Sequence, residues 1–187
     1  MFGKLSLSAI IFYSGLLFSA DTQLNLYRPF AVSSKHVAPY ITSTISGHCS
    51  QQSERIKRED AWHCISNEDV IYDPCFTKRF GVMTTLICPE SPWSSRSVQM
   101  TVPNRLDERD HRLLDMSRTL PWGIELTSGE HCISIKSEQY FDGLQVHYQC
   151  SKAVFLLGAP QRCATKWTIL RHDDSGIAMV NVYRAWF

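Results

Sequence analysis

The amino-acid sequence predicts an all-β protein, a mostly antiparallel sandwich or open barrel that disulfide bonds stabilise, with at most one or two short helices. Short runs in which apolar and polar residues alternate recur between turn-forming Gly, Pro, Asn and Asp residues, as in antiparallel sheets. Seven cysteines occur among the 187 residues. Cysteines at this density persist as disulfides where the compartment is oxidising, which points to a protein outside the cytosol.

Residues 1–20 have the composition of a signal peptide. A lysine supplies the positive charge, and residues 5–18 carry no charge over a length that suits a signal peptide and is short for a membrane span. Two small residues, Ser19 and Ala20, then precede the polar Asp21. We therefore expect a periplasmic or secreted protein, with the segment removed after about Ala20 or kept as an anchor. No later stretch of the sequence has the roughly 20 apolar residues of a membrane-spanning helix, so we do not expect an integral helical membrane protein.

Residues 21–47 are expected to form an extended arm or linker. This segment lacks cysteine, is rich in Ser and Thr, is interrupted by Pro29 and Pro39, and shows no lasting apolar period of 2 or 3.6. The arm carries apolar side chains that are candidates for binding a partner: Leu24, Leu26, Tyr27 and Phe30. Residues 48–187 are then expected to fold as one disulfide-stapled β domain.

Within that domain, strand-like runs follow one another with turn residues between them. The runs are residues 97–102, 122–127, 132–136, 144–150, 167–171 and 177–187. Residues 127–130 and 172–176 have the composition of hairpin connections. The clearest alternation places Leu144, Val146, Tyr148 and Cys150 on one face and Gln145, His147 and Gln149 on the other. This pattern describes a half-buried antiparallel strand.

The densest charged run, residues 105–118, alternates in sign. Such runs are usually solvated, and this one contains the single plausible helix, near residues 106–116. The formal net charge of the chain is +1, from 19 Lys and Arg residues against 18 Asp and Glu residues. Binding to nucleic acid needs positive charge clustered on one face, so we expect no nucleic acid partner.

The cysteine spacing suggests three disulfides and one free thiol. The pairs are Cys49–Cys64, Cys75–Cys88 and Cys132–Cys150, with Cys163 left over. If Asp142 and Gly143 lie in the loop between two antiparallel strands, Cys132 falls opposite Cys150. The other two pairs each close a loop of about 15 residues, worth about 3 kcal/mol in the chain-entropy model. Other connectivities stay open, and Cys163 is either a buried thiol or a link to another chain.

The sequence contains no motif for nucleotide, phosphate or calcium binding and no hydrolase signature. Zinc-binding cysteines are usually two to four residues apart, whereas ten residues separate the closest cysteines here, Cys64 and Cys75. We therefore expect no catalytic site, no metal site and no cofactor. Two polar groups remain as candidates for a hydrolase: Asp60 with His63, three residues apart, and the turn formed by His172, Asp173 and Asp174.

Several short motifs form a framework of Cys and Trp residues. They are Asp60-Ala61-Trp62-His63-Cys64, Ile71-Tyr72-Asp73-Pro74-Cys75-Phe76, Cys88-Pro89, Pro92-Trp93, Pro121-Trp122-Gly123-Ile124-Glu125-Leu126, Tyr148-Gln149-Cys150 and Arg184-Ala185-Trp186-Phe187. Through these motifs, residues 47–187 resemble a group of exported, uncharacterised bacterial proteins with no established activity. The resemblance implies export and a shared disulfide framework, and it leaves the mechanism open.

We expect a non-enzymatic binding or assembly module that acts in the periplasm, at the cell envelope or outside the cell. Its partner would be an envelope or extracellular protein or glycan, reached through a β-surface and the arm. The five tryptophans are expected in the core, with a platform for stacking a glycan or peptide as the alternative. The alternative functions are a secreted hydrolase with a His/Asp site and a small outer-membrane β-barrel, since residues 177–187 end on an aromatic residue as barrel strands often do.

Overall fold

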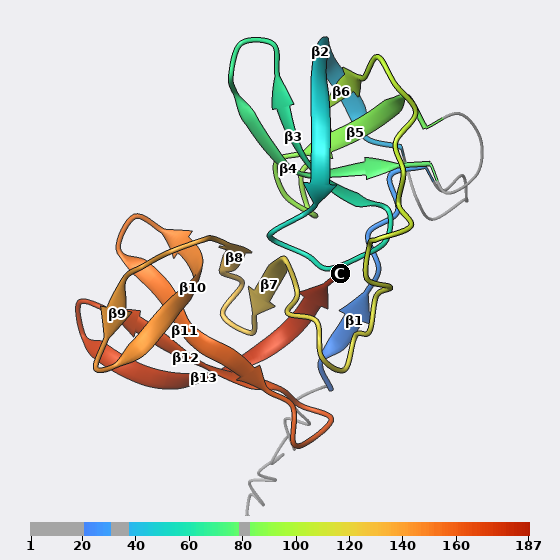
Figure 1. Cartoon of the computed structure of the whole chain (residues 1–187). Helices are drawn as coiled ribbons and strands as arrows, with labels where there is room; N and C mark the ends of the chain where they lie inside the picture. The colour runs from blue at the N-terminus through green and yellow to red at the C-terminus, as the bar shows by residue number, and fades with distance from the viewer. Residues whose placement is uncertain (1–20, 31–37, 79–82) are drawn as a thin grey trace, which may run out of the picture.

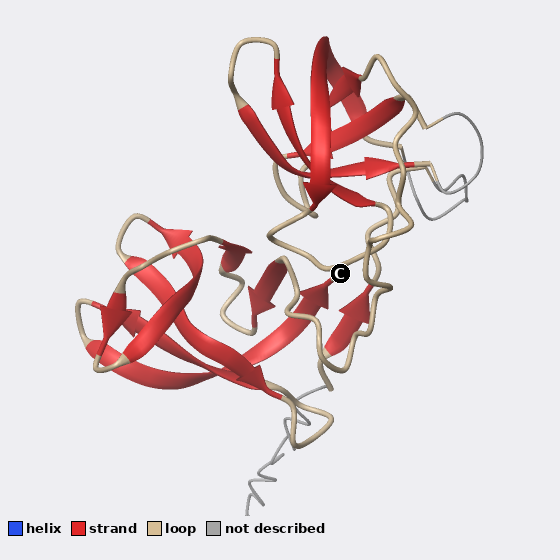
Figure 2. Cartoon of the chain, in the orientation of Figure 1, coloured by secondary structure: helices blue, strands red, loops and turns tan. Residues whose placement is uncertain are grey.

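The computed structural model describes residues 21–30, 38–78 and 83–187. Within these ranges the regular secondary structure consists of β-strands alone (Figure 2). Together with the three disulfides, this confirms the prediction of an all-β, disulfide-stabilised fold. The strands form two barrels joined by a shared core (Figure 1). The predicted signal peptide, residues 1–20, lies outside the described residues.

The first barrel is formed by the earlier strands of the chain. They are β2 (Tyr40–Gln52), β3 (Ala61–Ser66), β4 (Ile71–Thr77), β5 (Thr85–Pro89) and β6 (Arg96–Thr101). Each strand pairs antiparallel with the next, and β2 closes the barrel by running parallel to β6. Gly47 lies where β2 passes from β6 to β3, and a Cβ atom there would be 2.4 Å from the carbonyl oxygen of Ile65. Only glycine allows so close an approach of the two strands.

The second barrel is formed by the later strands. They are β7 (Gly123–Leu126), β8 (His131–Ser134), β10 (Leu144–Ser151), β11 (Val154–Gln161), β12 (Thr168–Asp173) and β13 (Gly176–Trp186). They are ordered β7-β8-β10-β11-β12-β13, and the antiparallel pairing of β13 with β7 closes the ring. Two short strands are added at its edges: β1 (Gln23–Asn25), parallel to β13, and β9 (Tyr140–Phe141), antiparallel to β10.

The strands expected from alternation are present, and their ends differ from the expected ones by at most two residues. The turns at residues 127–130 and 172–176 connect β7 to β8 and β12 to β13, as expected. However, the predicted single domain at residues 48–187 is two barrels. Alternation along one strand predicts which face is buried, but it does not determine which distant strand closes a sheet.

The prediction of a helix near residues 106–116 is wrong, because this segment forms a loop. The carboxylate of Asp107 accepts a hydrogen bond from the backbone N–H of Arg109 at 3.1 Å, and that of Asp115 accepts one from the N–H of Ser117 at 2.9 Å. Bonds of this kind between a side chain and the backbone two residues further on compete with helical bonding. The alternating charges also supply no apolar face that a helix would bury.

The described residues of the expected arm, 21–30 and 38–47, contribute strands to both barrels. β1 adds to β13, and β2 begins at Tyr40, so the expected boundary at residue 48 falls inside a strand. Three of the four apolar side chains proposed to bind a partner pack against the chain's own core: Leu26, Tyr27 and Phe30. Leu24 remains 46% exposed. The segment is therefore anchored within the fold, because burying its apolar side chains there is favourable.

One apolar cluster crosses the junction between the barrels. Ile56 and Phe76 of the first barrel pack with Trp122 and other buried residues of the second. The ring of Tyr27 lies between them, 5.3 Å from the ring of Phe76 and 5.5 Å from that of Trp122. Aromatic rings at these separations attract one another in addition to the area they bury. The continuous core fixes the two barrels against each other.

Arg58 lies at the same junction and is only 4% exposed. Its guanidinium donates hydrogen bonds to the main-chain oxygens of Tyr27 at 2.6 Å and Phe187 at 3.1 Å, and to the carboxylate of Asp60 at 2.7 Å. It also lies over the ring of Phe76, 4.8 Å from the centroid. A buried charge is tolerated only when its donors find partners, and here the partners come from three separate segments.

The three predicted disulfides are confirmed, and each joins neighbouring antiparallel strands. Cys49 is directly opposite Cys64 in the pairing of β2 with β3. The other two pairs follow one step beyond paired residues, at Cys75–Cys88 on β4 and β5 and at Cys132–Cys150 on β8 and β10. Asp142 and Gly143 form a turn before β10, as the pairing argument requires. Cys163 is a free, exposed thiol.

Tyr148 provides a test of the core through pH. Its side chain is 0% exposed, and its hydroxyl donates a hydrogen bond to the carbonyl oxygen of Pro121 at 2.9 Å. Burial raises the pKa of Tyr148 well above its ordinary value, so the folded state keeps a proton that the unfolded state releases above about pH 10. Its contribution to stability is therefore complete below pH 10 and falls as the pH rises further, by up to about 1.4 kcal/mol per pH unit.

We expect Tyr148→Phe to lose about 1 kcal/mol of unfolding free energy at pH 7, from the missing hydrogen bond. The same variant should show a shallower decline between pH 10 and 11, measured by urea unfolding at each pH. Burial also raises the pKa of Tyr27, so some alkaline decline should remain. An identical alkaline slope in the variant and the wild type would contradict the burial of an uncharged Tyr148.

Candidate functional site between the barrels

A cleft with a volume of about 1610 Å³ lies between the two barrels. The first barrel contributes β4, the end of β5 and the segment that follows β2, residues 54–57. The second barrel contributes β8, β10 and the residues directly after β8. The loop at residues 112–120, where a helix was expected, forms the third side.

The wall from the second barrel is polar because β10 alternates. Val146 and Tyr148 face the core and are at most 1% exposed. The residues that alternate with them, Gln145, His147 and Gln149, lie on the other face of the strand and line the cleft. Burial lowers the pKa of His147, which keeps its imidazole neutral at pH 7. The strand β10 therefore offers amide and imidazole groups for hydrogen bonds, and the charge of this wall comes from Lys136, after β8.

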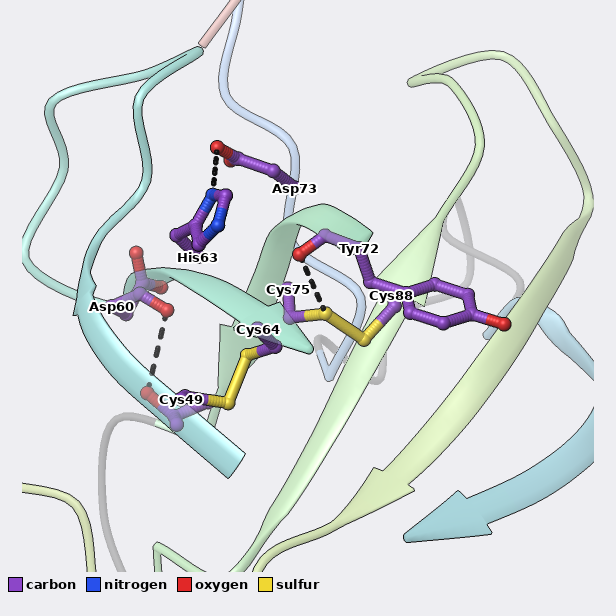
Figure 3. The surroundings of a disulfide bond; sticks show 9 residues. Cys49, Asp60, His63, Cys64, Tyr72, Asp73, Cys75 and Cys88 are labelled. Carbon is purple, nitrogen blue, oxygen red and sulfur yellow. Dashed lines mark hydrogen bonds and ion pairs between the residues drawn. A yellow bond between two sulfur atoms is a disulfide. The ribbon is translucent and has the colours of Figure 1, made fainter. Parts of the chain in front are cut away.

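The wall from the first barrel includes an open strand edge. Among the described residues, β4 pairs with β5 only at Phe76 and Thr77, whereas β5 pairs with β6 over its whole length. The first residues of β4, 71–74, thus have a strand neighbour on one side only, which is β3. The disulfide Cys75–Cys88 lies where the two strands separate (Figure 3).

A polar cluster centred on Asp73 lies beside this edge. One carboxylate oxygen accepts a hydrogen bond from the hydroxyl of Ser53, and the other accepts one from the N–H of Glu54 at 2.9 Å. The second oxygen is also 3.1 Å from Nδ1 of His63, which points toward it (Figure 3). The hydroxyl oxygen of Ser53 in turn accepts bonds from two backbone N–H groups, each at 3.1 Å. Ser53 is 0% exposed and acts as a cap for the turn that follows it.

This cluster contains Ser, His and Asp, but its arrangement differs from a catalytic triad. In a triad the hydroxyl bonds to the histidine, and the carboxylate orients the histidine from the other side. Here the hydroxyl of Ser53 bonds to Asp73 itself and is buried. Ser53 is therefore held as a structural group, and only the pair of His63 with Asp73 is placed to exchange a proton with a molecule in the cleft.

The predicted pairing of Asp60 with His63 does not form. Asp60 bonds to Arg58 at the junction, and His63 bonds to Asp73. Asp60 directly precedes β3, which begins at Ala61, and residues three apart in extended chain point to opposite faces. The partner of His63 is instead Asp73, which lies on the neighbouring strand and is ten residues away in sequence.

The second predicted group, at residues 172–174, belongs to the turn between β12 and β13. The ring of His172 stacks on Phe141 with centroids 3.9 Å apart. Asp173 bonds to the hydroxyl of Ser175 and to Arg171; these contacts, the hydroxyl first, lower the pKa of Asp173 to about 2. These side chains stabilise a hairpin and do not line the cleft. Among the described residues, no group of three His, Cys, Asp or Glu side chains is placed to hold a metal ion.

The charges of the cleft are only partly paired. Glu54 forms an ion pair with Lys136 at 3.0 Å that crosses from the first barrel to the second, and this contact lowers the pKa of Glu54. Asp115 bonds to Ser117 and lies 3.7 Å from Arg118. By contrast, Arg55 and Arg112 form no ion pair with any carboxylate of the described residues. Neither arginine is recognisable from the sequence, because an arginine in a mixed-charge segment carries no pattern that marks it as unpaired.

The tryptophans do not line the cleft. Trp62, Trp122 and Trp167 are at most 8% exposed, as expected for core residues. Instead, the exposed apolar side chains at the cleft are Ile71, which is 62% exposed, and Leu113, which is 75% exposed. No tryptophan therefore provides a stacking platform here, and the partly exposed aromatic side chain that lines the cleft is Tyr72.

No family model, curated protein or solved structure matches this chain, so its function has to be argued from this geometry. Within residues 21–30, 38–78 and 83–187, no helix has the length and apolar character that crossing a membrane requires. The three disulfides are consistent with a periplasmic or extracellular location.

Proposed function

We propose that this chain is an exported, non-enzymatic binding or assembly module that holds its partner in the cleft between its two barrels. The observation that carries the proposal is the size and lining of that cleft. Its volume of about 1610 Å³ exceeds the 300–1,000 Å³ usual for sites that enclose a small molecule. A cleft of this size, open to solvent, accommodates a segment of a polymer.

The exposed apolar side chains at the cleft favour a macromolecular partner. Ile71 and Leu113 are 62% and 75% exposed, and exposed apolar side chains beside a groove of polar residues are typical of protein-binding sites. The proposal places the partner at the cell envelope or outside the cell, as the disulfides and the composition of residues 1–20 suggest. The cleft, and not the arm at residues 21–47, is proposed to bind the partner, since Leu26, Tyr27 and Phe30 pack against the chain's own core.

Photo-crosslinking in native envelopes tests this proposal. We expect a photoreactive phenylalanine analogue at Leu113 to form a discrete adduct, because the side chain projects at the cleft and is exposed. The matched control is the same analogue at Met179, which is 59% exposed on β13 and does not line the cleft. Adducts at both positions with the same partners, or at neither, would contradict a binding site in the cleft.

A secreted hydrolase is the second candidate, and the pairing of His63 with Asp73 favours it. An aspartate that accepts a hydrogen bond from Nδ1 of a histidine leaves Nε2 as a proton acceptor, which is half of a general-base arrangement. His63→Gln separates the two functions. A binding module keeps its adduct at Leu113 in this variant, whereas a hydrolase loses turnover of whatever ester, amide or glycoside it cleaves.

A further inference from the structure

We infer that the cleft binds an extended polypeptide segment rich in acidic side chains, which adds as a strand to the open edge of β4. This inference rests on the proposed function and names the chemistry of the partner. Within the part of the chain that the structure describes, three features of the cleft point to such an occupant: a strand edge without a neighbour, arginines without a carboxylate, and exposed apolar side chains beside them.

The open edge offers backbone hydrogen bonds to an added strand. Among the described residues, 71–73 of β4 have β3 as a strand neighbour on one side, and β5 departs from the other side beyond the disulfide Cys75–Cys88. Pro74, the next residue of β4, has no N–H to donate, so the donors of this edge come from residues 71–73. An exposed strand edge presents unpaired N–H and C=O groups that a second chain can complete at a spacing of about 4.8 Å. Addition of an extended peptide to such an edge is a recurring mode of recognition.

The charges favour carboxylates on the added strand. Three carboxylates of the cleft already have partners: Asp73 bonds to Ser53 and His63, Glu54 to Lys136, and Asp115 to Ser117. Glu90 is a further negative charge at the cleft, and Arg55 and Arg112 are positive charges that form no ion pair with a carboxylate of the described residues. Arginine binds carboxylates with two parallel hydrogen bonds, and such pairs determine the choice of partner more than the total affinity.

The apolar side chains supply anchors for alternate positions of the strand. In an extended segment, successive side chains point to opposite sides, so apolar residues can contact Ile71 or Leu113 while the carboxylates between them reach the arginines. The polar wall of β10, with Gln145, His147 and Gln149, then faces the segment from the second barrel. Because amides both donate and accept, this wall can bond to polar side chains of the bound segment, while the backbone of the segment pairs with β4.

A polypeptide explains these features better than a glycan. Sugars stack on exposed aromatic rings, but no tryptophan lines the cleft, and its one partly exposed aromatic ring among the described residues is that of Tyr72. An open strand edge, in contrast, matches the regular donor and acceptor pattern of an extended peptide. An acidic glycan remains the alternative occupant, and the experiment below separates it from a peptide.

Selection from a displayed library of random peptides of about eight residues, a common strand length, tests the inference with the intact chain. We expect the selected peptides to be enriched in Asp and Glu, separated by apolar residues. Arg55→Glu with Arg112→Glu should weaken their binding at least about tenfold and should shift a fresh selection toward Lys and Arg. The control is Arg105→Glu with Arg109→Glu, which changes the net charge equally and lies outside the cleft.

Two further measurements complete the test. N-methylation of alternate backbone amides of a selected peptide should abolish binding for one set of amides and spare the other, because only one edge of the added strand faces β4. If the charge reversal disturbs folding, Arg55→Gln with Arg112→Gln should give the same loss of affinity. Selected peptides without acidic residues, or acidic peptides insensitive to these variants, would overturn the inference.

Failure of the inference is distinguishable from failure of the proposed function. An adduct at Leu113 without any acidic peptide in the selection would leave the cleft as a binding site and reject this occupant. If heparin, used as an acidic glycan and added before irradiation, prevented the Leu113 adduct and no peptide were enriched, the cleft would be assigned to a glycan. Loss of the Leu113 adduct altogether would reject both.

Discussion

Replacing Arg58 with methionine is expected to lower the free energy of unfolding by about 3–5 kcal/mol. Methionine preserves part of the apolar stem and removes every donor. The change leaves the carboxylate of Asp60 without its buried cation, and it leaves the main-chain oxygens of Tyr27 and Phe187 without the hydrogen bonds at 2.6 and 3.1 Å. Urea unfolding monitored by tryptophan fluorescence measures the loss.

Two comparisons make this result specific. Arg109→Met removes an arginine whose side chain is 87% exposed and which pairs only with Asp107, so we expect no measurable change. Arg58→Lys should recover little, because a lysine presents one point charge where three segments are now bonded by a planar group with five N–H donors. A loss below about 1 kcal/mol for Arg58→Met would contradict a structural role of this residue at the junction.

The partner of Arg58 gives an internal check. Asp60→Asn removes the negative charge and keeps the shape, so it should destabilise the wild type more than it destabilises Arg58→Met. The two changes should be coupled by about 0.5–3 kcal/mol, the range for residues in direct contact. Strict additivity would mean that the two groups, 2.7 Å apart, do not stabilise each other.

Removing the disulfide Cys75–Cys88 is the second change with a large expected effect. Substituting both cysteines by alanine should cost about 2–5 kcal/mol, the usual range for a native disulfide in a small exported domain. We also expect the loss of structure to be confined to one place, the contact between β4 and β5. Among the described residues, β4 and β5 pair only at Phe76 and Thr77, so this bond is a main link between the two strands.

Hydrogen exchange measured by mass spectrometry should show lost protection in β4 and β5 of this variant. Cys49→Ala with Cys64→Ala is the matched control, because it removes a disulfide between strands that are paired on both sides of the bond, from Gly47 to Gln52. We expect its lost protection to be spread over the first barrel or small. Equal opening of β4 from β5 in both variants would contradict the role given to Cys75–Cys88.

The loss of Cys75–Cys88 also bears on the cleft. Opening β4 away from β5 moves the edge at residues 71–74, which the proposed partner would use. The loss of peptide binding in Cys75→Ala with Cys88→Ala should therefore exceed the loss in Cys49→Ala with Cys64→Ala at equal fraction folded.

Several features could be predicted from the sequence because they depend on neighbouring residues. The period of two from Leu144 to Cys150 predicts a half-buried strand, and its polar face is the one that lines the cleft. The pairing of Cys132 with Cys150 follows from strand direction and a turn at Asp142 and Gly143. In both cases the relevant geometry, alternation or pairing across a short connection, is local.

Other features could not be predicted, because they depend on contacts between distant segments. His63 lies three residues after Asp60 in the sequence, yet its partner is Asp73 on the adjacent strand. Nothing in residues 21–47 shows that Tyr27 contacts both Phe76 and Trp122. Apolar residues without a clear period are consistent with both a free arm and a docked one, and only the available partner surface decides.

The amino-acid sequence by itself therefore determined the all-β class, the strands of the second barrel and the three disulfides, since alternation, turn residues and cysteine spacing act over short distances. The tertiary structure decided that the strands close into two barrels, that Arg58 is buried between them, and that a cleft with an open strand edge and unpaired arginines results. Barrel closure and burial depend on which distant segments pack together, and the free energy of that packing cannot be derived from any single segment.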